Sequence, residues 1–195
     1  VVVGDEAGTA ISTGDENVLM GYKAGQALSS GTSNVAIGNE ALHTEDGHGK
    51  NVAVGLQSLF TLNAGADGFN TAVGYQSGKL ITTGTDNTIV GGLSGDAITT
   101  AAGCTLVGKE AGTAITTGGD NTGIGKGALK AHTTGTGNVA VGKDALEANT
   151  TASNNTAVGK FALTANTTGT ENVAVGAQAL EANTTGNSNT ALGMK

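Results

Sequence analysis

The chain has 195 residues, of which 34 are glycine, none is proline and one is cysteine, and its formal net charge is −7. With nine basic residues, none of them arginine, it lacks the clustered positive charge that phosphate contacts need, so we expect no nucleic-acid partner. A single cysteine excludes an internal disulfide, and the lack of 18 consecutive apolar residues argues against direct membrane insertion of this segment.

A repeat of 17 residues runs through the whole chain. Each unit begins with a marker residue and has glycine four positions later. An unbroken repeat predicts a single domain over residues 1–195, which we expect to be a segment of a longer fibre. The markers are Asn17, Asn34, Asn51, Asn70, Asn87, Cys104, Asn121, Asn138, Asn155, Asn172 and Asn189, and the unit from Asn51 to Asn70 has two extra residues.

Each unit opens with a short strand. Three residues separate the marker from the glycine; the first is Val or Thr and the third is a large aliphatic, as in residues 138–142, Asn-Val-Ala-Val-Gly. This pattern predicts a strand that ends at a glycine with positive φ or with no room for a side chain. A second apolar cluster and a Thr-Thr-Gly corner complete the unit. We therefore predict an all-β fold, a parallel β-solenoid (β-roll) of about eleven 17-residue coils.

The second apolar cluster has one alternative interpretation. Ala-Leu-x-Ala-Asn, as in residues 145–149, has the pattern of an amphipathic helix. Such a helix would be shorter than about eight residues and is bounded by Thr and Gly, so we favour strand and turn.

The eighth and eleventh positions after the marker compensate for each other. Gly112 at the eighth position accompanies Ile115 at the eleventh, whereas Leu146 at the eighth accompanies Asn149. The two extra residues occur in the one coil that has leucine at both positions, Leu59 and Leu62. We predict that one large side chain per coil fills one shared core slot.

The marker column is expected to be structural. Identical asparagines in stacked coils lie about 4.8 Å apart and can form a hydrogen-bonded ladder. Cys104 would then be a small, buried substitute in that ladder; the alternative is a reactive thiol.

The strands also predict a partner. Both faces of residues 139–141 are apolar, which indicates burial on both sides. We expect the first and third strand residues to point into the solenoid and the middle residue to pack against another copy of the chain.

The strand sequences resemble a known family. Asn-Val-Ala-Ile-Gly at 34–38 and Asn-Val-Ala-Val-Gly at 51–55, 138–142 and 172–176 resemble the repeat of YadA-like trimeric autotransporter heads. Residues 155–169 are similar to repeats in bacteriophage and bacterial tail-fibre proteins. The resemblance covers the whole chain, although the period here is longer than in the autotransporter heads. It implies a left-handed β-roll, three copies of which form a rod that projects from a cell or virion surface and binds host or matrix surfaces.

The charged side chains do not indicate catalysis. Glu110, Asp144, Glu147 and Glu181 recur at equivalent places in their coils, so their proximity follows from the repeat and does not mark an acid/base pair. We therefore expect no enzymatic activity, no cofactor and no metal. A column of lysines should lie at a solvent-exposed corner and aid solubility, with a glycan- or anion-binding stripe as the alternative; its members are Lys109, Lys126, Lys143 and Lys160.

Residues 43–75 are the least regular part of the repeat. An irregular bulge with aromatic side chains suits contact with a host-surface glycan or protein. Two imidazoles alone make a poor metal site, and the alternative is a solvated bulge whose phenylalanines plug a widened coil. The candidate receptor-contact residues are His43, His48, Phe60, Phe69 and Tyr75.

The sequence thus favours a structural and adhesive surface-fibre segment, a homotrimeric rod that is extracellular, either on a cell surface anchored in the outer membrane or in a virion tail fibre. One alternative is a depolymerase-type β-helix, which would need an acidic cleft. Another is an ice-binding solenoid, because Thr pairs such as Thr150-Thr151 recur. Adjacent residues of a strand point to opposite faces, however, so these pairs cannot form one flat threonine array.

Overall fold

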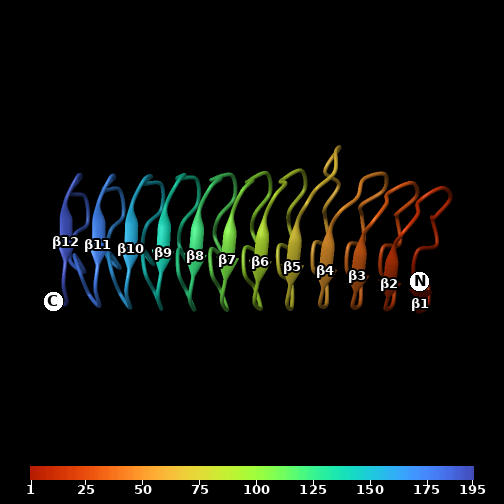
Figure 1. Cartoon of the computed structure of the whole chain (residues 1–195), viewed down its shortest axis with the longest axis horizontal. Helices are drawn as coiled ribbons and strands as arrows, with labels where there is room; N and C mark the ends of the chain where they lie inside the picture. The colour runs from red at the N-terminus through yellow and green to blue at the C-terminus, as the bar shows by residue number, and fades with distance from the viewer.

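The chain forms one continuous stack of coils. The structure, a computed structural model, describes residues 1–195 and contains twelve strands and no helix. All twelve strands lie in one parallel sheet, in the order of the sequence (Figure 1). The predicted all-β parallel solenoid of about eleven coils is confirmed. The strands are β1 (Val2–Val3), β2 (Val18–Met20), β3 (Val35–Ile37), β4 (Val52–Val54), β5 (Thr71–Val73), β6 (Thr88–Val90), β7 (Thr105–Val107), β8 (Thr122–Ile124), β9 (Val139–Val141), β10 (Thr156–Val158), β11 (Val173–Val175) and β12 (Thr190–Leu192).

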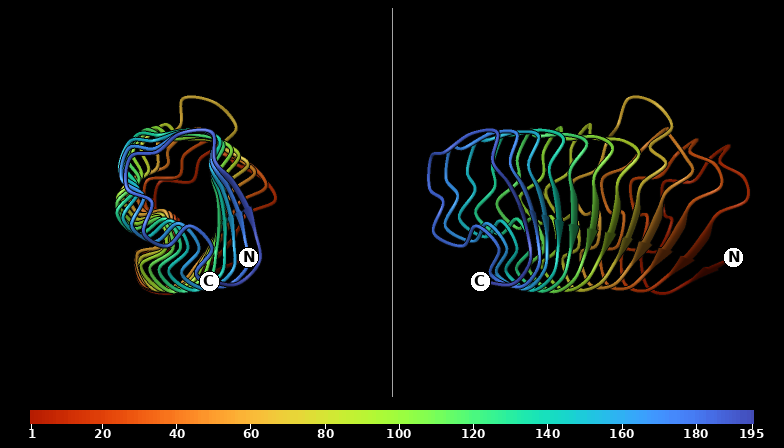
Figure 2. Two further views of the ribbon diagram at one scale, coloured as in Figure 1. Left: turned by 90° about the vertical axis from the view of Figure 1, so that its left-hand side faces the viewer. Right: turned by 60° about the vertical axis from the view of Figure 1, so that its left-hand side comes forward.

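Neighbouring strands pair in the register of the repeat. Thr156 of β10 lies opposite Val139 of β9 and Val173 of β11, one unit before and one unit after it. The longer unit keeps this register, since Val52 pairs with Thr71. Its extra length leaves the stack as a projecting loop, visible in the yellow-orange part of the chain (Figure 2).

The glycine that ends each strand is required for two reasons. Gly142 has a φ of 137°, a conformation that L side chains rarely adopt. A Cβ placed there would also lie 2.6 Å from the carbonyl carbon and oxygen of Gly159 in the next coil. Both reasons given by the sequence are therefore confirmed, and the close approach of successive coils depends on this column.

The strand orientation differs from our prediction. The middle strand residue points into the solenoid, since Leu106, Ala140 and Ala157 are completely buried. The first and third residues, such as Val139 and Val141, are only partly buried and face outward. The prediction was wrong because the interior already receives the large side chain of the eighth or eleventh position. Only one further side chain, usually alanine, fits beside it.

The shared core slot is confirmed. A Cβ added to Gly112 would lie 2.8 Å from Cδ1 of Ile115, so the Ile115 side chain occupies the space above the glycine. In the other class of coil Leu146 is fully buried. There the side-chain Nδ2 of Asn149 donates to the Ala152 carbonyl oxygen at 3.3 Å, and its Oδ1 accepts from the Ala152 N–H at 3.2 Å.

Leucine at the eighth position is held in a strained conformation. Leu146 has a φ of 51°, in the left-handed region, close to the 58° of Gly112. This conformation costs a non-glycine residue about 1–2 kcal/mol. The leucine persists because burial of its side chain outweighs this cost.

We expect Leu146→Gly to lower the free energy of unfolding by about 1–3 kcal/mol, because a core loss of about 2–5 kcal/mol is partly offset by release of the backbone strain. Adding Asn149→Ile should recover much of the loss, since this pair recreates the Gly112 and Ile115 arrangement. Urea denaturation of the single and double variants measures both effects. Additive losses in the double variant would show that the two positions occupy separate spaces.

Candidate functional site

The marker asparagines form the predicted ladder. Nδ2 of Asn138 donates to Oδ1 of Asn121 at 3.1 Å and to the carbonyl oxygen of Ala152 at 2.9 Å. Oδ1 of Asn138 accepts from the backbone N–H of Asn155 at 3.0 Å. Asn138 is completely buried. Each side chain thus satisfies backbone groups of its own turn and of the next coil, which is a structural role.

Cys104 occupies the ladder as a weak substitute. Its N–H donates to Oδ1 of Asn87 at 3.0 Å, and its Sγ lies 3.4 Å from the carbonyl oxygen of Gly118. Burial raises the pKa of the Cys104 thiol, with a smaller opposing effect from the Asn121 backbone N–H. A buried thiol with a raised pKa is a poor nucleophile.

Cys104→Asn should therefore raise the free energy of unfolding by about 1 kcal/mol, because an asparagine restores the amide hydrogen bonds to both neighbouring coils. Thermal unfolding followed by circular dichroism measures the change. Cys104→Ala is the matched control and should give no gain. A destabilised Cys104→Asn variant would mean that the ladder has no room for an amide at this level.

The irregular segment contains one aromatic stack. The rings of His43 and Phe60, at equivalent positions in successive coils, lie 4.9 Å apart with an interplanar angle of 22°. Both residues are partly buried. Beside them, the Thr44 hydroxyl donates to the carbonyl oxygens of Phe60 and Leu62 at 2.9 and 3.1 Å. The Thr44 hydroxyl thus ties this part of the segment to the next coil.

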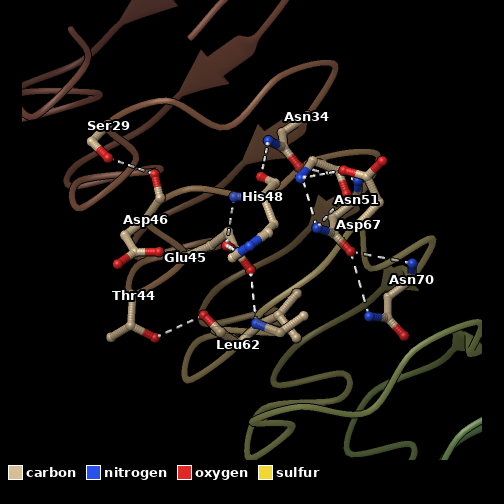
Figure 3. A network of polar contacts seen from close by, with 12 residues as sticks. Ser29, Asn34, Thr44, Glu45, Asp46, His48, Asn51, Leu62, Asp67 and Asn70 are labelled. Carbon is tan, nitrogen blue, oxygen red and sulfur yellow. Dashed lines mark hydrogen bonds and ion pairs between the residues drawn. The ribbon is translucent and has the colours of Figure 1, made fainter. Parts of the chain in front are cut away.

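Glu45 is a buried carboxylate at the eleventh position of its coil. Its Oε1 accepts from the backbone N–H of His48 at 3.1 Å, and its Oε2 accepts from the N–H of Ala64 at 3.3 Å (Figure 3). Nδ1 of His48 lies 3.3 Å from the same Oε1. Glu45, Asp46 and His48 could together offer three metal-ligating atoms within 4.8 Å of one another. Because both Glu45 oxygens already cap backbone groups, as Asn149 does in its coil, we interpret Glu45 as structural.

Phe69 and Tyr75 are the most exposed of the five candidate contact residues, each with 53% of its surface accessible. They lie on either side of β5, Phe69 two residues before its first residue and Tyr75 two residues after its last. Nζ of Lys50 sits 4.9 Å from the Phe69 ring centroid and 2.6 Å from Oδ2 of Asp67. That lysine, followed by the Gly49 N–H, lowers the pKa of Asp67 despite partial burial.

The five candidate residues do not converge on one site. His43 and Phe60 stack on each other, His48 lies beside Glu45, and Phe69 and Tyr75 flank a strand. Their separation follows from their different positions within the repeat unit, which place them on different sides of the coil.

The most extensive candidate interface is the outward side of the strands. We call the first and third residues of β2 to β12 the outer stripe. None of these residues is charged, all are Val, Thr, Ile, Met or Leu, and all are half-buried or exposed. Seen along the rod, the strands make one nearly straight side of the cross-section (Figure 2). The sequence revealed this apolar face, but we had assigned the wrong residues to it.

The lysine column lies next to the outer stripe, one residue after the glycine corner. All four lysines are exposed, as predicted. Nζ of Lys109 is 3.3 Å from Oε1 of Glu110, and Nζ of Lys130 is 3.2 Å from Oε2 of the same carboxylate. Lys130 first, and then Lys109, hold the pKa of Glu110 below its usual value. Glu110 thus pairs with lysines at the surface, where such pairs contribute little to stability.

His132 is a fully buried imidazole at the eleventh position of its coil. Its Nε2 lies 2.8 Å from the carbonyl oxygen of Gly135, whereas its Nδ1 is buried without a hydrogen-bond partner. Burial lowers the pKa of His132, and the Gly135 carbonyl opposes this only partly. Asn149, Asn166 and Asn183 occupy the equivalent position in the following coils.

Because the folded-state pKa of His132 is lowered, its contribution to stability is complete above the unfolded pKa of about 6.5 and is lost as the pH falls below it. We expect His132→Asn to reduce the acid sensitivity of the fold by up to about 1.4 kcal/mol per pH unit below that point. Urea midpoints at pH 7.5 and 5.0 for both proteins measure the difference. Equal decreases of the urea midpoint in the two proteins between pH 7.5 and 5.0 would show that the acid sensitivity comes from the carboxylates and not from His132.

No protein-family model, curated protein or solved structure matches this chain. The structure contains no helix long and apolar enough to cross a bilayer.

Proposed function

We propose that the chain is a segment of a rigid surface fibre, in which copies pack side by side through the outer stripe and hold an adhesive surface away from a cell or virion. The observation that carries this proposal is the outer stripe itself. It is uncharged from β2 to β12 and lies outside the solenoid core. Large contiguous apolar surfaces are uncommon on monomeric proteins and mark interaction sites.

The shape of the stripe favours a partner of the same length. Its residues repeat once per coil, at about the 4.8 Å spacing of paired strands, so another copy of the chain matches every level. The resemblance to autotransporter heads and tail fibres supports three copies around a common axis and an extracellular location. In this arrangement the exposed corners of each coil remain available to a host-surface glycan or protein.

The outer stripe also favours a second candidate function, ice binding. Thr71, Thr88, Thr105 and Thr122 stand in four consecutive coils at the first strand position, each with an aliphatic residue at the third position. Such a flat, regular array suits ordered water if the stripe is not covered by protein. The recurring Thr-Thr pairs are less suited to ice binding, because the first threonine of a pair already uses its hydroxyl in a hydrogen bond to the next coil. Thr133 Oγ1, for example, donates to the Thr150 carbonyl oxygen at 2.9 Å.

Light scattering of the wild-type chain should give about three times the 18.8 kDa monomer mass. Val107→Asp, at the centre of the outer stripe, should lower this mass toward the monomer, because a carboxylate buried between copies lacks a partner. Thr117→Asp, at an exposed corner outside the stripe, is the matched control and should leave the mass unchanged.

A wild-type chain that is well folded by circular dichroism but monomeric at all concentrations would contradict the packing proposal. Thermal hysteresis of that monomer, abolished by Thr105→Asp, would then identify ice as the partner of the stripe.

A further inference from the structure

One corner of the rod gathers three metal-ligating side chains. Glu45, Asp46 and His48 lie in the corner before β4, and each offers one ligand atom within 4.8 Å of the other two. From the sequence we expected no metal, because two imidazoles alone make a poor site. The fold instead places one of those imidazoles, His48, beside two carboxylates (Figure 3).

We propose that this corner binds one divalent first-row transition-metal ion, such as Zn²⁺, through Nδ1 of His48, Oε1 of Glu45 and the carboxylate of Asp46. Imidazole and carboxylate groups both ligate such ions, and water completes the coordination of a zinc ion that has three protein ligands. All three ligands belong to one coil and none belongs to the outer stripe. The proposal is therefore independent of the packing of copies.

Nδ1 of His48 is the atom that carries this proposal. It lies 3.3 Å from Oε1 of Glu45, yet it is buried and makes no hydrogen bond. Two ligands of a tetrahedral zinc ion, each about 2.0–2.1 Å from the metal, are about 3.3 Å apart. Nδ1 and Oε1 thus already have the separation that a shared ion requires. The rest of the His48 ring is partly exposed, which leaves a route from solvent.

Glu45 can ligate an ion and keep its structural role. A carboxylate oxygen has two lone pairs. The backbone N–H of His48 uses one on Oε1, and the N–H of Ala64 uses one on Oε2. These bonds fix a side chain that is completely buried, so the ligand oxygen is held in place before an ion arrives.

Asp46 completes the ligand set and the balance of charge. Its backbone carbonyl oxygen accepts from the Ser29 hydroxyl at 2.9 Å, whereas its exposed carboxylate makes no hydrogen bond or ion pair within the chain. The two carboxylates match the double positive charge of the ion. Lys50, the nearby cation, is already paired with Asp67 at 2.6 Å.

The repeat shows that the fold does not need these ligands. The other 17-residue units have Ser or Thr at the position of Asp46 and Gly or Ala at the position of His48. Their corners form without an acid or an imidazole, so corner formation does not account for the pair in this one coil. The same comparison supplies substitutions that a corner of this kind tolerates.

Isothermal titration calorimetry with Zn²⁺ tests the site. We expect one strong site per wild-type chain and at least tenfold weaker binding by His48→Ala and by Asp46→Ser. His43→Thr, which removes the other imidazole of the irregular segment, is the matched control and should bind as tightly as the wild type. Each variant carries a residue that other units have at that position, so the fold should persist, as circular dichroism will show.

Nitrogen-15 NMR of the histidine rings identifies the ligand atom. Zn²⁺ should shift the ring signals of His48 and leave those of the buried His132 unchanged. Mg²⁺ at the same concentration should shift neither, because it prefers oxygen ligands.

Two results would overturn the proposal. One is a wild-type chain that does not bind Zn²⁺. The other is equal Zn²⁺ affinity of the wild type and His48→Ala, which would assign the ion to surface carboxylates. Neither result concerns the outer stripe, so the proposed function is tested separately by Val107→Asp.

Discussion

The structure depends on the exchange of hydrogen bonds between the marker side chain of one coil and the backbone of the next. An asparagine such as Asn138 serves the coils on both sides of it as well as its own turn. Because its amide is completely buried, each of these bonds must be made or the coil carries an unsatisfied polar group. This requirement fixes the register of successive units. It also explains why one unit can contain two extra residues only if it expels them as a loop.

Fixed register has consequences for every other position. Glycines such as Gly142 stack so closely that no Cβ fits between coils, and in the regular coils the eighth and eleventh positions share one core slot, as Gly112 and Ile115 do. Hydroxyl groups at the corners bond to the coil above, and lysines align along one edge. Each coil added to such a stack repeats the same buried positions and the same surface positions. Any apolar residue on the outer face of the strand is therefore repeated along the whole rod, which is how a short sequence pattern becomes a long interface.

Much of this arrangement follows from the repeat alone. The spacing of Asn and Gly predicted the solenoid, and the exchange between Gly112 with Ile115 and Leu146 with Asn149 predicted the shared slot. The orientation of the strand was not predictable in the same way. A strand of three apolar residues can point either of its faces into the solenoid, and which face does so depends on how much of the interior volume the rest of the coil fills. Here Leu146 and its equivalents fill most of it, so a single alanine points inward.

The candidate site shows a similar limit. Proximity in sequence suggested that the aromatics of residues 43–75 form one patch, yet position within the unit decides on which side a residue lies. His43 and Phe60 share a position and therefore stack, whereas Phe69 and Tyr75 occupy opposite flanks of β5.

Side-by-side packing through the outer stripe is the central claim, and the mass per unit length of the rod tests it most directly. Small-angle X-ray scattering on an absolute scale gives this quantity independently of the total mass. Three copies packed side by side should have about three times the mass per unit length of one 18.8 kDa chain, at the length of a single stack. A longer rod with the mass per unit length of one chain would show end-to-end association and would contradict the packing.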